Sequence, residues 1–431
     1  MGGPSRPDAA WLDAIAHLTL QLGRILLLNG SETEQVYASM VRFAAAFGAD
    51  ANLLVSYEAI LVTLSAGEEI RTKVGHRLPG LGVAMAAIEA VNGVVDDAEA
   101  GRLGPDEVRT ALDSIEHQPP LYARWLVVAA LGVTAASLSR LFGGDWLACL
   151  AAGVAGAVGT WVRLELGRRH VNPVLSVFVV ALLSGIVGGG FIDLGMSDAP
   201  ALALVAPAMI LVPGVPLING ILDMIRNHVM MGISRLGFAA LVVMAISLGV
   251  FAATLITRIG VPVDAPTRTI GVPEDALFSA LAAGGYALLF SVRARMAWAC
   301  GLCGVASHTL RTLLFHYGID LVTGTLAGAL LAGVLAQGFA RYFRAPAVAL
   351  AFPGVVAMIP GAYAFRAVFG TLRIAEATAD SATVTGTLSL SATVVLMVGA
   401  IAVGVAAPAL VFPVNRGGSE RGAAGMTVRR G

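Results

Sequence analysis

The sequence predicts an α-helical polytopic membrane protein that carries a small α+β domain at its N-terminus. Of its 431 residues 57% are hydrophobic and only 13% are charged, and the mean hydropathy is +0.80. Soluble domains carry about 25% charged residues. From Trp125 onward, apolar runs recur near the ~20 residues needed to cross a bilayer. Residues 1–123 hold 8 basic and 16 acidic side chains, against 20 and 12 in the rest, so the two parts are expected to lie in different solvents.

Residues 1–123 are predicted to form a soluble domain that stays in the cytoplasm. Gln21 and Arg24 interrupt the first apolar stretch, which therefore does not resemble a cleaved signal peptide. Helical spacing of apolar residues predicts a first helix over 10–28. Ser31, with Glu34 three residues later, has the spacing of a capping box and predicts the start of a second helix.

The rest of this domain is predicted to mix strands and helices. Residues 52–64 are rich in Val, Ile, Leu and Tyr, which favours paired strands, although a helix is an alternative. A helix is expected over 78–99, and another starts near Pro105, where proline and acidic residues suit a helix N-terminus.

Ten apolar runs, plus or minus one, are long enough to span a bilayer, and they form two blocks of five. The predicted spans are residues 124–142, 145–162, 174–192, 199–218, 236–257, 277–292, 297–316, 319–339, 346–369 and 388–412. We thus expect a first membrane block at 124–257 and a second at 277–412. An extracytoplasmic connecting loop at 258–276 separates them, and a cytoplasmic tail follows at 413–431.

The arginine distribution tests this topology independently, because positive residues accumulate on the cytoplasmic side of membranes. With the N-terminus inside, thirteen arginines, Arg235 among them, fall on the cytoplasmic side, and five, Arg311 among them, fall outside. We therefore expect a multi-pass protein of the cytoplasmic membrane, embedded in the lipid bilayer, with both termini in the cytoplasm.

The fourth and ninth spans contain Pro-Gly pairs in the middle of the membrane. Proline removes a backbone donor, so carbonyl groups are left free and must face protein, water or ligand. Pro213 and Pro360 lie at matching positions, but the fourth span runs inward and the ninth outward. Broken helices at corresponding positions of two inverted five-helix halves indicate a midplane substrate site in a secondary transporter. The alternative is that these residues serve helix packing alone.

Polar groups follow both breaks and extend the candidate site. The predicted substrate-binding and transport-path residues are Pro213, Gly214, Asn219, Asp223, Pro353, Gly354, Pro360, Gly361, Tyr363 and Arg366. Charge within the membrane is costly and often functional. The alternative for Asp223 and Arg366 is that they lie near helix ends and reach the headgroups. His308 has no carboxylate neighbour in its span and is interpreted as a packed polar residue.

No catalytic, cofactor or metal site is expected. Cys300 and Cys303 have CxxC spacing, but in a Gly/Ala-rich membrane segment such small residues favour close helix packing. A membrane enzyme acting through the soluble domain is one alternative, and a channel or scaffold is another. Neither a GxSxG motif, a P-loop nor a selectivity-filter repeat supports them. No basic tail indicates nucleic acid, and a homo-oligomer is compatible with the sequence.

With these features the chain resembles the bacterial threonine/serine exporter family over nearly its whole length. The resemblance rests on residues 26–33, the Pro119-Pro120 linker, residues 212–223 and residues 358–366. Members of that family join a cytoplasmic N-terminal domain to ten transmembrane helices in a bacterial inner membrane. Their two membrane blocks can occur on separate chains, which suits a boundary within 258–276.

The resemblance implies efflux of L-threonine and L-serine by a proton-coupled antiporter, so a small amino acid and protons are the expected partners. Relatives with split subunits are associated with dicarboxylate export, which is the alternative substrate class. An α-amino acid needs acceptors for its ammonium and donors for its carboxylate. Asp223 is then a candidate for holding a proton or cation, and Arg366 for holding a carboxylate.

The resemblance also marks Gly30, Glu32 and Thr33 as a candidate functional turn of the cytoplasmic domain. Residues 34–36 read Glu-Gln-Val, where many relatives carry an Arg-Val-Glu-like run. We therefore expect a functional role for this turn if its residues contact other parts of the protein.

Overall fold

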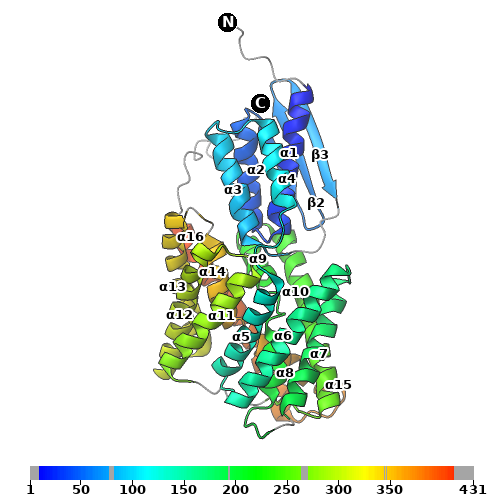
Figure 1. Ribbon diagram of the computed structural model, residues 1–431, viewed down its shortest axis with the longest axis vertical. Coiled ribbons are helices and arrows are strands. Elements are labelled where there is room, and N and C mark those ends of the chain that lie inside the picture. The colour runs from blue at the N-terminus through cyan, green and yellow to red at the C-terminus, as the bar shows by residue number, and fades with distance from the viewer. Residues whose placement is uncertain are drawn as a thin grey trace.

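The computed structural model describes residues 9–76, 82–192, 195–263, 270–343, 345 and 347–411. Figure 1 shows helices and a sheet from the N-terminal part of the chain stacked on one end of a bundle of long helices. The tail predicted at 413–431 lies outside the described residues, as does part of the predicted loop at 258–276.

The N-terminal part packs helices against one face of a three-stranded sheet. Its elements are α1 (Ala9–Leu28), α2 (Thr33–Ala46), β1 (Asp50–Val55), β2 (Ala59–Ala66), β3 (Glu69–His76), α3 (Met85–Glu99) and α4 (Pro105–Glu116). The strands pair antiparallel in the order β1-β2-β3, so the strand prediction is confirmed and its helical alternative is wrong. In β2, buried Ile60, Val62 and Leu64 alternate with more exposed neighbours, and α1 contacts β2 and β3.

Two local predictions in this part are wrong. The helix predicted over 78–99 starts only at α3, because the N–H groups of Gly82 and Ala84 donate to the carbonyls of Leu28 (3.0 Å) and Asn29 (3.2 Å). The first residues of that prediction lie outside the described chain.

The predicted capping box at the start of α2 is the second wrong prediction. The N-cap of α2 is Glu32, and its side chain makes no capping hydrogen bond. The hydroxyl of buried Ser31 also has no hydrogen-bond partner among the described residues. The acceptor for the first amide of α2 comes from elsewhere in the chain, as described below.

The membrane part follows the predicted spans in order. Its helices are α5 (Arg124–Leu141), α6 (Trp146–Arg168), α7 (Pro173–Ile192), α8 (Ala201–Met209), α9 (Gly214–Ile225), α10 (Val229–Thr257), α11 (Val272–Leu289), α12 (Ala294–His316), α13 (Leu321–Phe343), α14 (Ala347–Val355), the 3-10 turn η1 (Val356–Met358), α15 (Gly361–Ala375) and α16 (Ser381–Val411). Long apolar helices and bent helix pairs of this kind make the chain a mostly helical, polytopic membrane protein.

Among the described residues, α5, α6, α7, α10, α13 and α16 are each long and apolar enough to cross a membrane, and so are the bent pairs α8–α9 and α14–α15. By length and composition α1 meets the same criteria, but it packs within the N-terminal part. A count of ten spans also requires α11 and α12, which do not meet these criteria of length and composition.

The second membrane block begins earlier than predicted. α11 starts at Val272 rather than at 277, with Pro273 at its start and Glu274 and Asp275 in its first turn. Proline and acidic residues are favourable there because the first amides lack intrahelical partners and the helix dipole is positive at this end. Asp275, assigned to the loop from the sequence, thus belongs to a helix.

Asp145 joins the loop between α5 and α6 to the segment that precedes α8. Its carboxylate accepts from the N–H of Ala148 at 2.8 Å, from Ser197 Oγ at 2.6 Å, and from the N–H groups of Asp198 at 2.7 Å and Ala199 at 3.3 Å. Partial burial alone would raise the pKa of Asp145, but these hydrogen bonds hold it below its ordinary value.

We expect Asp145→Ala to lower the free energy of unfolding by about 1 kcal/mol at neutral pH, because α6 loses its N-cap. A depressed folded-state pKa means that the carboxylate stabilises the fold above its ordinary pKa of about 3.9, and that this contribution is lost as pH falls through the folded-state pKa. The melting-temperature difference between wild type and variant in detergent should therefore shrink in acid. Asp145→Asn can still cap the helix and should lose less. A difference independent of pH would contradict this role.

Candidate functional site

The two broken helices are interrupted by the same turn. α8 and α9 are bent by 55° and the α14–α15 pair by 47°. Pro213 has φ −78° and ψ 68°, and Pro360 has φ −77° and ψ 51°. In both places the N–H of the residue after the proline donates to the carbonyl of the residue before it, at 2.8 Å. These are the dihedrals and the hydrogen bond of an inverse γ-turn.

The two turns pack directly against each other. A methyl group at Gly214 would lie 2.5 Å from Ile359 Cδ1, and one at Gly361 would lie 3.1 Å from Val212 Cγ2. Each glycine of one turn thus faces the residue before the proline of the other. Four predicted site residues therefore meet at one place: Pro213, Gly214, Pro360 and Gly361. At this place a γ-turn interrupts the helical hydrogen bonding of each broken helix.

The other predicted Pro-Gly pair has a different place. Pro353 lies within α14, and a methyl group at Gly354 would lie 2.8 Å from Cys303 Cβ of α12. Ser307 Oγ, also from α12, lies 3.3 Å from the Gly354 carbonyl, to which it donates. Close approach of α14 and α12 accounts for this glycine.

Asn219 and Asp223 of α9 contact the turn between α1 and α2. Asn219 Nδ2 donates to the carbonyl of Gly30 at 2.9 Å, and the N–H of Thr33 donates to Asp223 Oδ1 at 3.1 Å. Gly30 has φ +91°, a region that favours glycine. Thr33 is the first residue of α2, so a carboxylate from the membrane part caps this helix and faces the positive end of its dipole.

Arg235 of α10, which the sequence analysis missed as a site residue, completes this contact. Its Nη1 lies 3.0 Å from Asp223 Oδ2, and its Nη2 donates to the carbonyl of Ser31 at 2.8 Å. Arg235 and Asp223 are each 1% exposed, so the alternative that Asp223 reaches the headgroups is wrong. Arg235 was counted as a loop arginine because α10 was predicted to start at 236, whereas it starts at Val229.

One ion pair and one histidine–carboxylate contact border the buried group. Arg226 Nη1 lies 2.7 Å from Glu32 Oε1, and His228 Nε2 lies 3.1 Å from Glu34 Oε2. All three residues of the predicted functional turn, Gly30, Glu32 and Thr33, thus contact the segment from α9 to α10. Together these residues form what we call the docking contact: Gly30, Ser31, Glu32, Thr33, Asn219, Asp223, Arg226 and Arg235.

The N-terminal part contacts the second membrane block through α3. The N–H of Met85 donates to the carbonyl of Phe290 at 2.8 Å, next to the end of α11. Glu89 of α3 forms ion pairs with Arg293, at 3.2 Å, and with Arg295. The N-terminal part therefore contacts both membrane blocks.

The membrane part is hollow at the end away from the N-terminal part, where Figure 1 places α8 and α15. The outer cavity, about 330 Å³, is lined by the start of α8, the start of α15 and the segment after α10, and includes Tyr363 and Arg366. Arg366 Nε donates to the carbonyl of Pro262 at 3.1 Å, and its guanidinium also donates to Val263. The predicted Tyr363 and Arg366 thus lie together, apart from Asn219 and Asp223.

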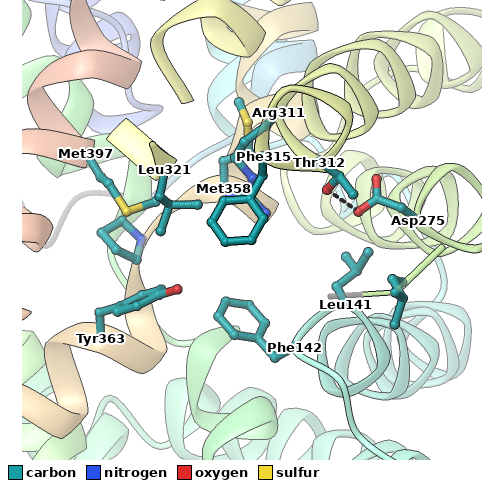
Figure 2. A pocket seen from close by; sticks show the side chains of 12 residues that line it. Leu141, Phe142, Asp275, Arg311, Thr312, Phe315, Leu321, Met358, Tyr363 and Met397 are labelled. Atoms are coloured by element: carbon teal, nitrogen blue, oxygen red, sulfur yellow. Dashed lines mark hydrogen bonds between the residues drawn. The ribbon is translucent and has the colours of Figure 1, made fainter. Parts of the chain in front are cut away.

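An inner cavity of about 40 Å³ adjoins the outer one. Phe142 and Tyr363 line both cavities, with 6.3 Å between their ring centroids. Figure 2 shows these two rings on one side of the inner cavity, with Phe315, Thr312 and Asp275 across from them. The pair of rings therefore separates the two spaces.

A buried polar cluster borders the inner cavity, and the sequence analysis did not select it. Asp275 of α11 accepts from Thr312 Oγ1 at 2.7 Å and from His308 Nδ1 at 2.8 Å, and Arg311 Nη2 lies 2.5 Å from His308 Nε2. The carboxylate that His308 lacks within its own span comes from another helix, and His308 is buried and hydrogen-bonded to it. The signal that could have found this cluster was Arg311, a charge inside an apolar run.

No group of three or more His, Cys, Asp or Glu side chains is placed to hold a metal ion in the described part of the chain. Cys300 and Cys303 are both buried, and neither forms a disulfide.

Comparison with known sequences identifies relatives of both membrane blocks. The family described as "Putative threonine/serine exporter" matches residues 17–257, and that described as "Threonine/Serine exporter, ThrE" matches residues 275–411. No solved structure matches the chain. The first match ends with α10, at residue 257, and the second begins within α11, at residue 275.

Individual relatives carry two kinds of name. The "Probable succinate transporter subunit YjjP" of Escherichia coli (strain K12) is 30% identical over 247 residues, which are 56% of this chain and 94% of that protein. The "Probable threonine/serine exporter" of Mycobacterium tuberculosis is 26% identical over 374 residues, 82% of this chain and 69% of that protein. The "Threonine/serine exporter" of Corynebacterium glutamicum is 21% identical over 383 residues, which are 85% of this chain and 77% of that protein. These are names of transporters rather than enzymes, and the chain belongs to the threonine/serine exporter family.

Proposed function

We propose that this protein is a secondary transporter that exports L-threonine and L-serine across a bacterial cytoplasmic membrane, driven by the proton gradient. The observation that carries the proposal is the pair of γ-turns, Pro213-Gly214 and Pro360-Gly361, packed against each other in the membrane part. On one side of them the docking contact closes the protein. On the other side two cavities open. A closed and a hollow side around paired broken helices is the arrangement expected of alternating access.

The proposal includes ten spans in two inverted halves. Each half has three helices, a broken helix and a final helix, and corresponding pairs are in contact: α5 with α6 as α11 with α12, and α7 with α10 as α13 with α16. In Figure 1 the first broken helix runs from α8 at the far end to α9 beside the N-terminal part, and the second runs the opposite way from α14 to α15. These correspondences support an inverted repeat.

Within this proposal the N-terminal domain of residues 1–123 lies in the cytoplasm. Asn219 and Asp223 then belong to a cytoplasmic gate, closed by Gly30, Glu32 and Thr33 of the docked domain. Tyr363 and Arg366 line the outward opening. Pro353 and Gly354 support the second broken helix from α12.

A dicarboxylate is the second candidate substrate, because the relative at 30% identity bears the name of a succinate transporter subunit. Its alignment covers 56% of this chain, whereas the relatives named threonine/serine exporters align over 82% and 85%. The broader alignments favour the amino acid.

Uptake of labelled L-threonine into proteoliposomes of the purified protein tests the function. We expect saturable uptake that an imposed pH gradient stimulates and that L-serine, but not D-threonine or succinate, competes. Protein-free liposomes and a protonophore serve as controls. Flux that only succinate competes would identify a dicarboxylate, rather than an amino acid, as the substrate class. Absence of flux with every solute would contradict the transporter assignment.

A further inference from the structure

The inner cavity presents one carboxylate and one guanidinium to the same small space. Asp275 of α11 and Arg311 of α12 both line it, together with the hydroxyl-bearing Thr312. The remaining lining is mostly apolar or aromatic, including Phe315, Met358 and Met397. Charged groups in an otherwise apolar membrane interior are costly to bury and mark ligand or ion paths.

We propose that this inner cavity is the binding site for the charged head of a zwitterionic α-amino acid, with Arg311 on its carboxylate and Asp275 on its ammonium. The proposal deepens the proposed transport function and rests on it. Thr312 Oγ1 can turn from Asp275 to accept from the ammonium, since a hydroxyl both donates and accepts.

The hydrogen bonds of the cluster hold both charges in place for this task. An arginine can only donate, so His308 Nε2 accepts from Arg311, and the Nδ1–H of the same ring donates to Asp275. His308 is therefore a neutral positioning residue that links the two charged groups. Thr309 and Ser279 hydroxyls also donate to Asp275, at 3.3 and 3.4 Å, which stabilises the ionised carboxylate.

The size of the cavity restricts the solute to a small one. At about 40 Å³ it has room for about three water molecules, as judged by the space that one buried water requires. An amino acid entering from the outer cavity must separate Phe142 from Tyr363, and its side chain then lies among aromatic and aliphatic groups. Because so little space remains beside the charged head, small side chains such as those of serine and threonine are favoured over larger ones.

The same charges select against a dicarboxylate. Succinate could place one carboxylate on Arg311, but its second would face Asp275 in a buried space, where like charges repel strongly. A zwitterion pairs both of its charges. The negative charge of Asp275 therefore makes the cavity favour the amino acid over the dianion.

Calorimetric titration of the purified wild-type protein with four ligands tests this assignment directly. The ligands are L-threonine, L-threoninol, which lacks the carboxylate, 2,3-dihydroxybutanoate, which lacks the ammonium, and succinate. We expect L-threonine to bind at least about tenfold more tightly than each of the others, because each loses one charge-assisted contact. Equal binding of all four, or no binding of L-threonine, would overturn the proposal.

A charge-neutralising variant distinguishes a ligand-binding role of Asp275 from a purely structural one. Asp275→Asn keeps the shape of the side chain but removes the repulsion of anions, so the preference between L-threonine and 2,3-dihydroxybutanoate should fall or invert. Asp380→Asn makes the same change at an exposed aspartate before α16 and should leave the preference unchanged. An unchanged preference in Asp275→Asn, with elution from size-exclusion chromatography as for wild type, would also overturn the site.

The two proposals can fail separately. Selective binding of L-threonine without flux in proteoliposomes would support the zwitterion site and reject the transport function. Stereoselective flux of L-threonine with equal binding of the analogues would retain the transport function and reject the site.

Discussion

Replacing Asp223 with alanine is expected to destabilise the protein by about 3–5 kcal/mol, because it leaves Arg235 buried without its carboxylate partner. Both side chains are 1% exposed, and the pair lies where α9, α10 and the start of α2 meet. The variant also removes the acceptor for the N–H of Thr33. Thermal unfolding in detergent, followed by size-exclusion chromatography, should show a large drop in melting temperature.

Two further variants define the cause of this loss. Glu165→Ala removes its surface pairs with Arg168 and Arg169 at the end of α6 and should cost about 0–1 kcal/mol. The double variant Asp223→Leu/Arg235→Met leaves no unpaired charge and should regain most of the lost stability. If Asp223→Ala melted at the same temperature as Glu165→Ala, the buried pair would not stabilise the docking contact.

Cross-linking the docking contact is expected to abolish transport. Glu32 and Arg226 lie on opposite sides of the contact, with 2.7 Å between their charged atoms. If the cytoplasmic side must open during each cycle, a reducible bismaleimide joining Glu32→Cys to Arg226→Cys should stop L-threonine flux, and reduction of the linker should restore it. The native cysteines Cys149, Cys300 and Cys303 are buried and should not react.

The matched control places the same linker inside the N-terminal domain. Arg42 and Glu99 form an ion pair between α2 and α3, so Arg42→Cys/Glu99→Cys can be linked without attaching the domain to the membrane part. Flux should persist in this control. Persistent flux in the Glu32/Arg226 pair, at complete cross-linking, would show that the docking contact stays closed during transport.

Much of the fold was predictable because it depends on local properties of the chain. Apolar runs of bilayer length predicted the order of the membrane helices, and enrichment in Val, Ile, Leu and Tyr over 52–64 predicted paired strands. The positions of both γ-turns were predictable, because Pro213 and Pro360 each remove a helical hydrogen-bond donor and the glycines after them tolerate close packing. Predictions of helix ends were less accurate where the first turn of a helix is polar. The acidic start of α11, at Glu274 and Asp275, resembles a loop in the sequence.

The candidate site was only partly predictable because its contacts join distant segments. Asn219, Asp223 and the turn at Gly30 were each selected, but no local pattern indicates that Asp223 caps a helix 190 residues earlier in the chain. Asp275 and His308 are 33 residues apart on different helices. Their pairing depends on how α11 packs against α12, and neither helix's sequence encodes that packing alone.

The attachment of the N-terminal domain to both membrane blocks has a thermodynamic consequence. Because α3 binds the end of α11 and the α1–α2 turn binds α9 and α10, the blocks cannot separate on this side while the domain keeps both contacts. In the proposed transport cycle, docking and release of the domain would thus be linked to the inward-closed and inward-open states. If the domain lies in the cytoplasm as proposed, a cytosolic molecule that binds its docked position more tightly than its released one would slow export without entering the transport path. The shift in the docking equilibrium would be at most the difference between the two binding free energies of that molecule.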